Sequence, residues 1–117
     1  MGWRQLKVWR KAHDLVKEVY GLTSAFPQNE LYGLTAQLRR SAVSVPANIV
    51  EGHSRHTTKE YLNFLFTARG SLEETRYHLL LAGDLGFVTK EQLQSLEEGY
   101  REASAMLNAL IKSLQEK

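Results

Sequence analysis

The sequence contains no cysteine, only two prolines and no long apolar run. Without cysteine there is no disulfide framework, no thiolate metal site and no cysteine nucleophile. The longest purely apolar stretch, Leu79 to Ala82, is far shorter than the roughly 20 residues that a transmembrane helix needs. The N-terminal residues lack the apolar segment of a secretory signal. We therefore expect a cytoplasmic protein with no membrane partner.

The length and the charge are those of one ordinary globular domain. The chain has 117 residues, so we expect a single domain over residues 1–117 with one hydrophobic core. The net charge is only +2, but residues 1–57 hold eight Lys and Arg against four Asp and Glu, and residues 58–117 hold seven against nine. This asymmetry permits a basic surface for phosphate. Pairing of opposite charges between helices or subunits explains it equally well.

The first two predicted helices follow from apolar residues spaced alternately by three and four. The first is expected over residues 5–25 and ends before Pro27, because a residue that precedes proline avoids the α conformation. The second is expected over residues 30–54, with Asn29 as its N-cap. Their apolar stripes are Val8, Ala12, Leu15, Val19, Leu22 and Phe26, and then Leu31, Leu34, Leu38, Ala42, Val45 and Ile49.

Two capping boxes mark the starts of the remaining helices. Thr57 with Glu60 opens a third helix of about 28 residues, which ends at Gly86, a residue that favours the left-handed conformation. Thr89 with Gln92 opens a fourth helix that runs to the end of the chain. Four amphipathic helices with short connections predict an all-α fold, an antiparallel up-down-up-down four-helix bundle.

Pro46 lies inside the pattern of the second helix. Proline cannot donate to the carbonyl group of Ala42 and its ring crowds that carbonyl, yet the apolar pattern resumes in phase. We therefore predict a kink at Pro46 rather than the end of a helix.

Several apolar residues lie outside the four stripes, more than a monomeric bundle needs. A contiguous apolar patch is typical of an oligomer interface, so we expect a closed homo-oligomer. The residues are Trp3, Phe64, Phe66, Leu80, Leu81 and Phe87.

No catalytic or metal motif is recognisable. Di-metal bundles use Glu-x-x-His pairs, but Glu74 and His78 are four residues apart and no second pair exists. His53 and His56 lack a third ligand at regular spacing, and a histidine at a helix end more often contacts carbonyls or solvent. Phosphate-binding loops and Gly-x-Ser-x-Gly are absent. We therefore predict no enzyme activity, no metal and no cofactor.

The segment around Pro46 carries the candidate nucleic-acid contacts. Arg39, Arg40 and Asn48, with Arg55 nearby and Arg69 on the third helix, could present donors to phosphate. For the segment around Pro46 we weigh a structural explanation above the functional one, because Arg40 and Asn48 can hold the kink and Arg55 can pair with Glu51. For Arg69, pairing with Glu73 within its own helix explains the residue equally well. The mid-helix glycine that follows Arg69, Gly70, is expected to permit close helix contact.

Several blocks, in order, make the chain resemble the bacterial four-helix-bundle family, also called the ribosomal RNA intervening-sequence protein family. The match runs from about residue 6 to 88. The blocks are Leu6-Lys7-Val8-Trp9 with Ala12, Phe26-Pro27, Leu31-Tyr32-Gly33-Leu34, Arg39-Arg40 to Gly52, Phe64-Leu65, Ala68-Arg69-Gly70-Ser71-Leu72-Glu73 and Leu85-Gly86. Ser41, Val45 and Val50 stand where the family pattern has Ala, Ile and Ala.

The resemblance implies a bundle that assembles as a pentamer and carries no catalytic residues. Relatives include the accessory protein of diversity-generating retroelements, which has a basic surface and is implicated in binding nucleic acid and a reverse transcriptase. Our first hypothesis is a non-enzymatic, oligomeric accessory protein that binds RNA or DNA. The alternative is a protein-interaction scaffold without nucleic-acid binding, and a hydrolase or metal enzyme ranks third.

Overall fold

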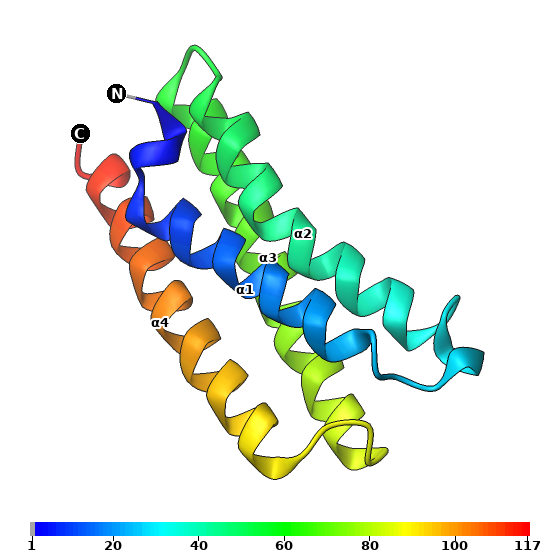
Figure 1. Cartoon of the computed structure of the whole chain (residues 1–117). Coiled ribbons are helices and arrows are strands. Elements are labelled where there is room, and N and C mark those ends of the chain that lie inside the picture. Colours follow the sequence, from blue (N-terminus) through cyan, green and yellow to red (C-terminus); the bar gives the residue numbers. More distant parts are fainter. Residues whose placement is uncertain (1) are drawn as a thin grey trace.

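The structure, a computed structural model, describes residues 2–117 and is an all-α bundle (Figure 1). Successive helices run antiparallel and pack side by side, and the last closes against the first. No strand occurs in this range, so the predicted fold class is confirmed. The elements are two 3₁₀ turns, η1 (Trp3–Gln5) and η2 (Gln28–Glu30), and four helices, α1 (Lys7–Thr23), α2 (Leu34–His53), α3 (Thr58–Asp84) and α4 (Lys90–Gln115).

The core lies along the bundle axis and contains most of the predicted stripe residues. Burial of such apolar surface is the main force that holds helices together in water. Of the two stripes listed above, Leu31 differs from prediction because it is 39% exposed, and Leu22 is partly buried against the core. The fully buried large side chains include Leu15, Leu38, Ile49, Leu65, Leu72, Leu79, Tyr100 and Leu107.

Both predicted N-caps are found, at the starts of α3 and α4, but only the second forms a full capping box. The hydroxyl of Thr57 accepts a hydrogen bond from the Glu60 backbone N–H at 3.1 Å. At Thr89 the box is complete, because the Gln92 side chain also accepts from the Thr89 backbone N–H at 2.9 Å. After α3, Gly86 adopts φ +80°, as expected for the residue that ends a helix.

The predicted starts of the first two helices are wrong. α1 begins at Lys7, because Leu6 is extended and separates it from η1. Asn29 is not an N-cap: it lies inside η2, and α2 begins only at Leu34. The Glu30 carboxylate accepts from the Leu34 backbone N–H at 3.2 Å, so a residue four positions back supplies the acceptor that we assigned to Asn29.

α2 continues through the buried Pro46 to His53, as the prediction of a kink rather than a stop requires. The bend itself stays a prediction. Across Pro46, the side-chain amide of Asn48 donates hydrogen bonds to the Ser44 carbonyl at 2.8 Å and to the Ser44 hydroxyl at 2.9 Å. The amide of Asn48 is thus used within its own helix, as the structural explanation predicted.

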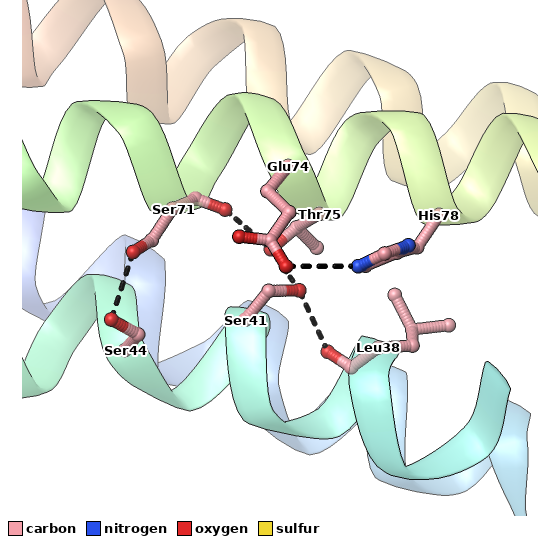
Figure 2. A network of polar contacts seen from close by, with 7 residues as sticks. All are labelled: Leu38, Ser41, Ser44, Ser71, Glu74, Thr75 and His78. Atoms are coloured by element: carbon pink, nitrogen blue, oxygen red, sulfur yellow. Dashed lines mark hydrogen bonds and ion pairs between the residues drawn. The ribbon is translucent and has the colours of Figure 1, made fainter. Parts of the chain in front are cut away.

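Polar side chains join α2 to α3 in the middle of the interface (Figure 2). The Ser44 and Ser71 hydroxyl oxygens are 2.8 Å apart, and the Thr75 hydroxyl lies 2.9 Å from that of Ser41. Ser41 also reaches the Leu38 carbonyl at 3.1 Å, and Thr75 the Ser71 carbonyl at 2.8 Å. Thr75 has one hydroxyl proton and donates it either to Ser41 or to the Ser71 carbonyl, while Ser41 donates to Leu38, so the contact between Ser41 and Thr75 favours one register of the two helices.

The end of α2 lies so close to α3 that only glycine fits. A Cβ atom on Gly52 would lie 2.7 Å from the Phe64 Cβ and 3.2 Å from the Tyr61 carbonyl oxygen. Gly70 is the opposite case, because an added Cβ atom would meet nothing within 4 Å. The expected reason for Gly70, close contact between helices of the same chain, is therefore wrong.

We predict opposite effects of adding a methyl group at these two glycines. Gly52→Ala should lower the free energy of unfolding by roughly 1–3 kcal/mol, because α2 must move away from α3. Gly70→Ala is the matched control and should raise it by up to about 1 kcal/mol, since alanine favours the helix and meets no neighbour. Urea denaturation followed by circular dichroism measures both, and equal effects would contradict the close α2–α3 packing.

Candidate nucleic-acid interface

Arg39 joins α2 to the end of α1. Its Nε–H donates to the Thr23 hydroxyl at 2.8 Å, and its guanidinium lies 4.5 Å from the centre of the Tyr20 ring. Thr23 in turn donates to the Val19 carbonyl at 2.7 Å. Arg39 is half-buried and performs a structural role that its sequence position did not reveal.

The remaining predicted site residues point in different directions. Arg40 is exposed and makes no hydrogen bond or ion pair to any of residues 2–117. Arg55 pairs with Glu51 at 3.0 Å, as predicted, and its guanidinium lies 4.6 Å from the centre of the Phe64 ring. Arg69 does not pair with Glu73 but donates to the Asn108 side chain of α4 at 3.2 Å.

The five residues proposed from the sequence therefore do not converge on one site. Arg39 faces α1, Arg69 faces α4, and the Asn48 amide is used inside α2. The helices pack in cyclic order, so the α1–α2 face and the α3–α4 face are opposite sides of the bundle. Whether any of the five contacts phosphate stays a prediction.

Folding gathers charge in a different way, along the bundle axis. We define the basic half as residues 2–15, 44–71 and 103–117, which share the end that holds both termini and the α2–α3 turn (Figure 1). It contains nine Lys and Arg against four Asp and Glu. The acidic half, residues 16–43 and 72–102, contains six against nine. Dividing the bundle at the middle of each helix thus separates positive from negative charge more strongly than dividing the sequence into residues 1–57 and 58–117.

The densest group of positive charge in the basic half lies at the start of α1. Arg4, Lys7, Arg10 and Lys11 line a groove of about 400 Å³ between this segment and Met106 of α4. Lys11 pairs with Glu102 at 3.2 Å. The other three are exposed, and none of them has a carboxylate partner within the part of the chain that the structure describes.

Aromatic rings lie directly under these cations. The Arg4 guanidinium is 4.3 Å from the Trp3 ring centre, and that of Arg10 is 5.2 Å from the Trp9 ring centre. The two indole rings meet edge to face at 4.8 Å, which orients the cations that they carry. Cations interleaved with aromatic rings suit a nucleic acid, whose phosphates attract the cations and whose bases stack on rings or guanidinium planes.

Sequence reasoning missed this cluster. The three exposed cations are spaced by three residues, a signal that is present in the sequence, but the site was predicted from the segment around Pro46 instead. Asp14 lines the same groove but pairs with Lys17, and Glu102 of α4 pairs with Lys11, so the three cations keep no carboxylate partner. Which part of α4 lies opposite follows only from the antiparallel packing.

The described residues offer no group of three His, Asp or Glu side chains that could hold a metal ion. His78 is buried and its Nε2 lies 3.1 Å from the Glu74 carboxylate, but both belong to one turn of α3 (Figure 2). His53 packs edge-on against Tyr61, and His56 is exposed in the turn after α2. Among the helices described, none is long and apolar enough to cross a membrane.

Comparison with known proteins gives one family. The sequence model described as 23S rRNA-intervening sequence protein matches residues 4–109. A solved structure from Bacteroides thetaiotaomicron, described as a protein with unknown function from the S23 ribosomal protein family, has the same fold with a TM-score of 0.83. It is 25% identical over 90% of this chain and 95% of that chain. No curated protein matches this chain.

We predict that the adjacent arginines of α2 differ in their effect on stability. Arg39→Ala should lower the free energy of unfolding by about 1–2 kcal/mol, because it removes the bond to Thr23 and the contact with the Tyr20 ring. Arg40→Ala, its matched neighbour, should change it by less than about 0.5 kcal/mol. Chemical denaturation of both variants checks this, and an unaffected Arg39→Ala variant would argue against the structural role.

Proposed function

This chain belongs to the 23S rRNA-intervening sequence protein family, and we propose on this basis that it is a non-enzymatic, oligomeric accessory protein that binds nucleic acid. The contact surface in this proposal is the basic half, centred on Arg4, Lys7 and Arg10. The observation that carries the proposal is the excess of unpaired positive charge at that end of the bundle. RNA is the first polymer to test, because the family takes its name from ribosomal RNA.

The charge distribution supports a contact with phosphate rather than with a neutral partner. Each Lys or Arg that neutralises a phosphate releases condensed counterions, which supplies affinity that does not depend on sequence. A +2 chain with evenly mixed charges would gain little from this effect, whereas the basic half presents its excess on one end. Arg55, Arg69, Lys59 and Lys112 extend the same half, so two of the residues selected from the sequence remain part of the proposed surface.

Self-association completes the proposal. The resemblance implies five copies, and an oligomer would present several basic ends to one nucleic acid, which raises avidity without any new contact. A cytoplasmic location and a protein partner such as a reverse transcriptase belong to the same proposal.

A scaffold without nucleic-acid binding is the second candidate. Large apolar side chains exposed on α1, α2 and the segment between them favour it, above all Tyr32, which is 94% exposed. Such residues on a surface are typical of protein–protein contact. The two candidates differ in one property, a salt-dependent affinity for RNA.

We predict that the triple variant Arg4→Ala, Lys7→Ala, Arg10→Ala binds labelled structured RNA and duplex DNA more weakly than the unmodified protein. The slope of log affinity against log salt should fall by about three, one for each lost phosphate contact. Fluorescence anisotropy at low and near-physiological salt measures this.

A second triple variant, Lys17→Ala, Lys90→Ala, Arg101→Ala, is the matched control. It removes the same three charges from the acidic half and should keep the affinity and the slope of the unmodified protein. Equal losses in both variants would mean that only net charge matters. No binding of the unmodified protein even at low salt would leave the scaffold as the function.

A further inference from the structure

A groove on one side of the acidic half combines apolar and cationic side chains. This α1–α2 groove has a volume of about 530 Å³ and contains no carboxylate among its lining residues. Tyr20, Leu31, Tyr32 and Val43 are all exposed there although they are large and apolar. The other lining residues include Arg40, which has no hydrogen-bond or ion-pair partner among residues 2–117, and Arg39, whose Nε donates to Thr23 and whose guanidinium lies over the Tyr20 ring. The groove thus offers apolar contact and two arginines.

The outer face of α3 has the opposite character. Phe66, Gly70, Glu73, Tyr77 and Leu80 follow one another at spacings of four and three, so they form one stripe that we call the α3 ridge. Tyr77 and Leu80 are 59% and 52% exposed. The ridge lies outside the core, and its contacts within the chain are peripheral: the Arg69 guanidinium lies 5.1 Å from the centre of the Phe66 ring, and Tyr77 lies against His78.

The ridge also differs from the groove in its net charge and in having a glycine at an exposed position of its helix. Glu73 and Glu97 share a single arginine, Arg76, at 3.1 and 3.3 Å, which leaves one net negative charge beside Tyr77 and Leu80. Gly70 costs the helix about 1 kcal/mol relative to alanine. An added Cβ atom at Gly70 would meet no atom of a neighbouring helix within 4 Å, so the helix backbone is open to a second surface there.

The groove and the ridge are complementary in charge to each other, and neither is complementary to a second copy of itself. The groove is cationic and lies on the α1–α2 side, whereas the ridge carries the excess negative charge of Glu73 and Glu97 and lies on the α3–α4 side, opposite in the bundle. We propose that the α1–α2 groove of one copy receives the α3 ridge of a second copy of this chain, in a head-to-tail contact. This inference rests on the proposed self-association and assigns the surfaces that make it.

A head-to-tail contact has a definite consequence. Each added copy leaves one groove and one ridge free, so the assembly grows until it closes into a ring, and every copy has the same environment. A self-complementary dimer would instead place the same patch on both sides, which would bring Arg40 toward its own equivalent. Charge therefore favours the head-to-tail arrangement.

The test uses two variants whose substitutions lie at exposed positions. The groove variant carries Tyr32→Glu and Arg40→Glu, and the ridge variant carries Tyr77→Lys and Leu80→Lys. Each alone should have the mass of a monomer by multi-angle light scattering and the circular dichroism spectrum of the unmodified protein, with a melting temperature lowered by the loss of the subunit contacts. A control variant, Lys90→Glu with Arg101→Glu, changes charge in the acidic half outside both surfaces and should keep the mass of the unmodified protein.

An equimolar mixture of the two variants gives the decisive result. The groove variant keeps an intact ridge and the ridge variant keeps an intact groove, so the mixture should form heterodimers of twice the monomer mass and nothing larger. Failure to form heterodimers, or variants that keep the oligomer mass, would overturn the assignment of surfaces while leaving self-association intact. A monomeric unmodified protein would overturn both, whereas the RNA titration would remain an independent test of nucleic-acid binding.

Discussion

The close packing of α2 against α3 is the constraint on which the rest of the structure depends. Gly52 admits the Tyr61 and Phe64 side of α3 to van der Waals contact, and the hydroxyl pairs Ser44–Ser71 and Ser41–Thr75 allow one register of the two helices. A shift by one turn would break both contacts between the helices, although Ser41 and Thr75 would keep their bonds to carbonyl groups of their own helices. The antiparallel order of the four helices places the α2–α3 turn at the end that also holds both termini (Figure 1).

Charge segregation follows from that arrangement. No single helix is strongly basic, but antiparallel packing brings the start of α1, the α2–α3 turn and the end of α4 to one end of the bundle. The same packing places the groove with Arg39 and Arg40 and the ridge with Glu73 on opposite sides of the acidic half. The proposed division of labour is therefore simple: the acidic half makes contacts between copies, and the basic half stays free for phosphate.

The sequence predicted what depends on local periodicity and capping. The four helices, the caps at Thr57 and Thr89 and the continuation of α2 through Pro46 all follow from short-range patterns. The N-cap at Asn29 failed because Glu30 supplies the acceptor for the Leu34 N–H through a turn that periodicity does not encode. The role of Arg39 depends on Thr23 and Tyr20, sixteen and nineteen positions away, and the isolation of Arg4, Lys7 and Arg10 depends on which part of α4 lies opposite. These contacts join different helices and form only when the bundle packs, so no local pattern in the sequence predicts them.

The proposed division of labour is tested most directly by mapping where RNA touches the protein. RNA that carries 4-thiouridine can be crosslinked to the protein by light, and the crosslinked residues can be identified by mass spectrometry. We predict crosslinks in the basic half, with Trp3 and the residues around Lys7 foremost, and few in the acidic half. Crosslinks concentrated at Tyr20 and Tyr32 in the α1–α2 groove would contradict this division, because that groove would then be the nucleic-acid site rather than a contact between copies.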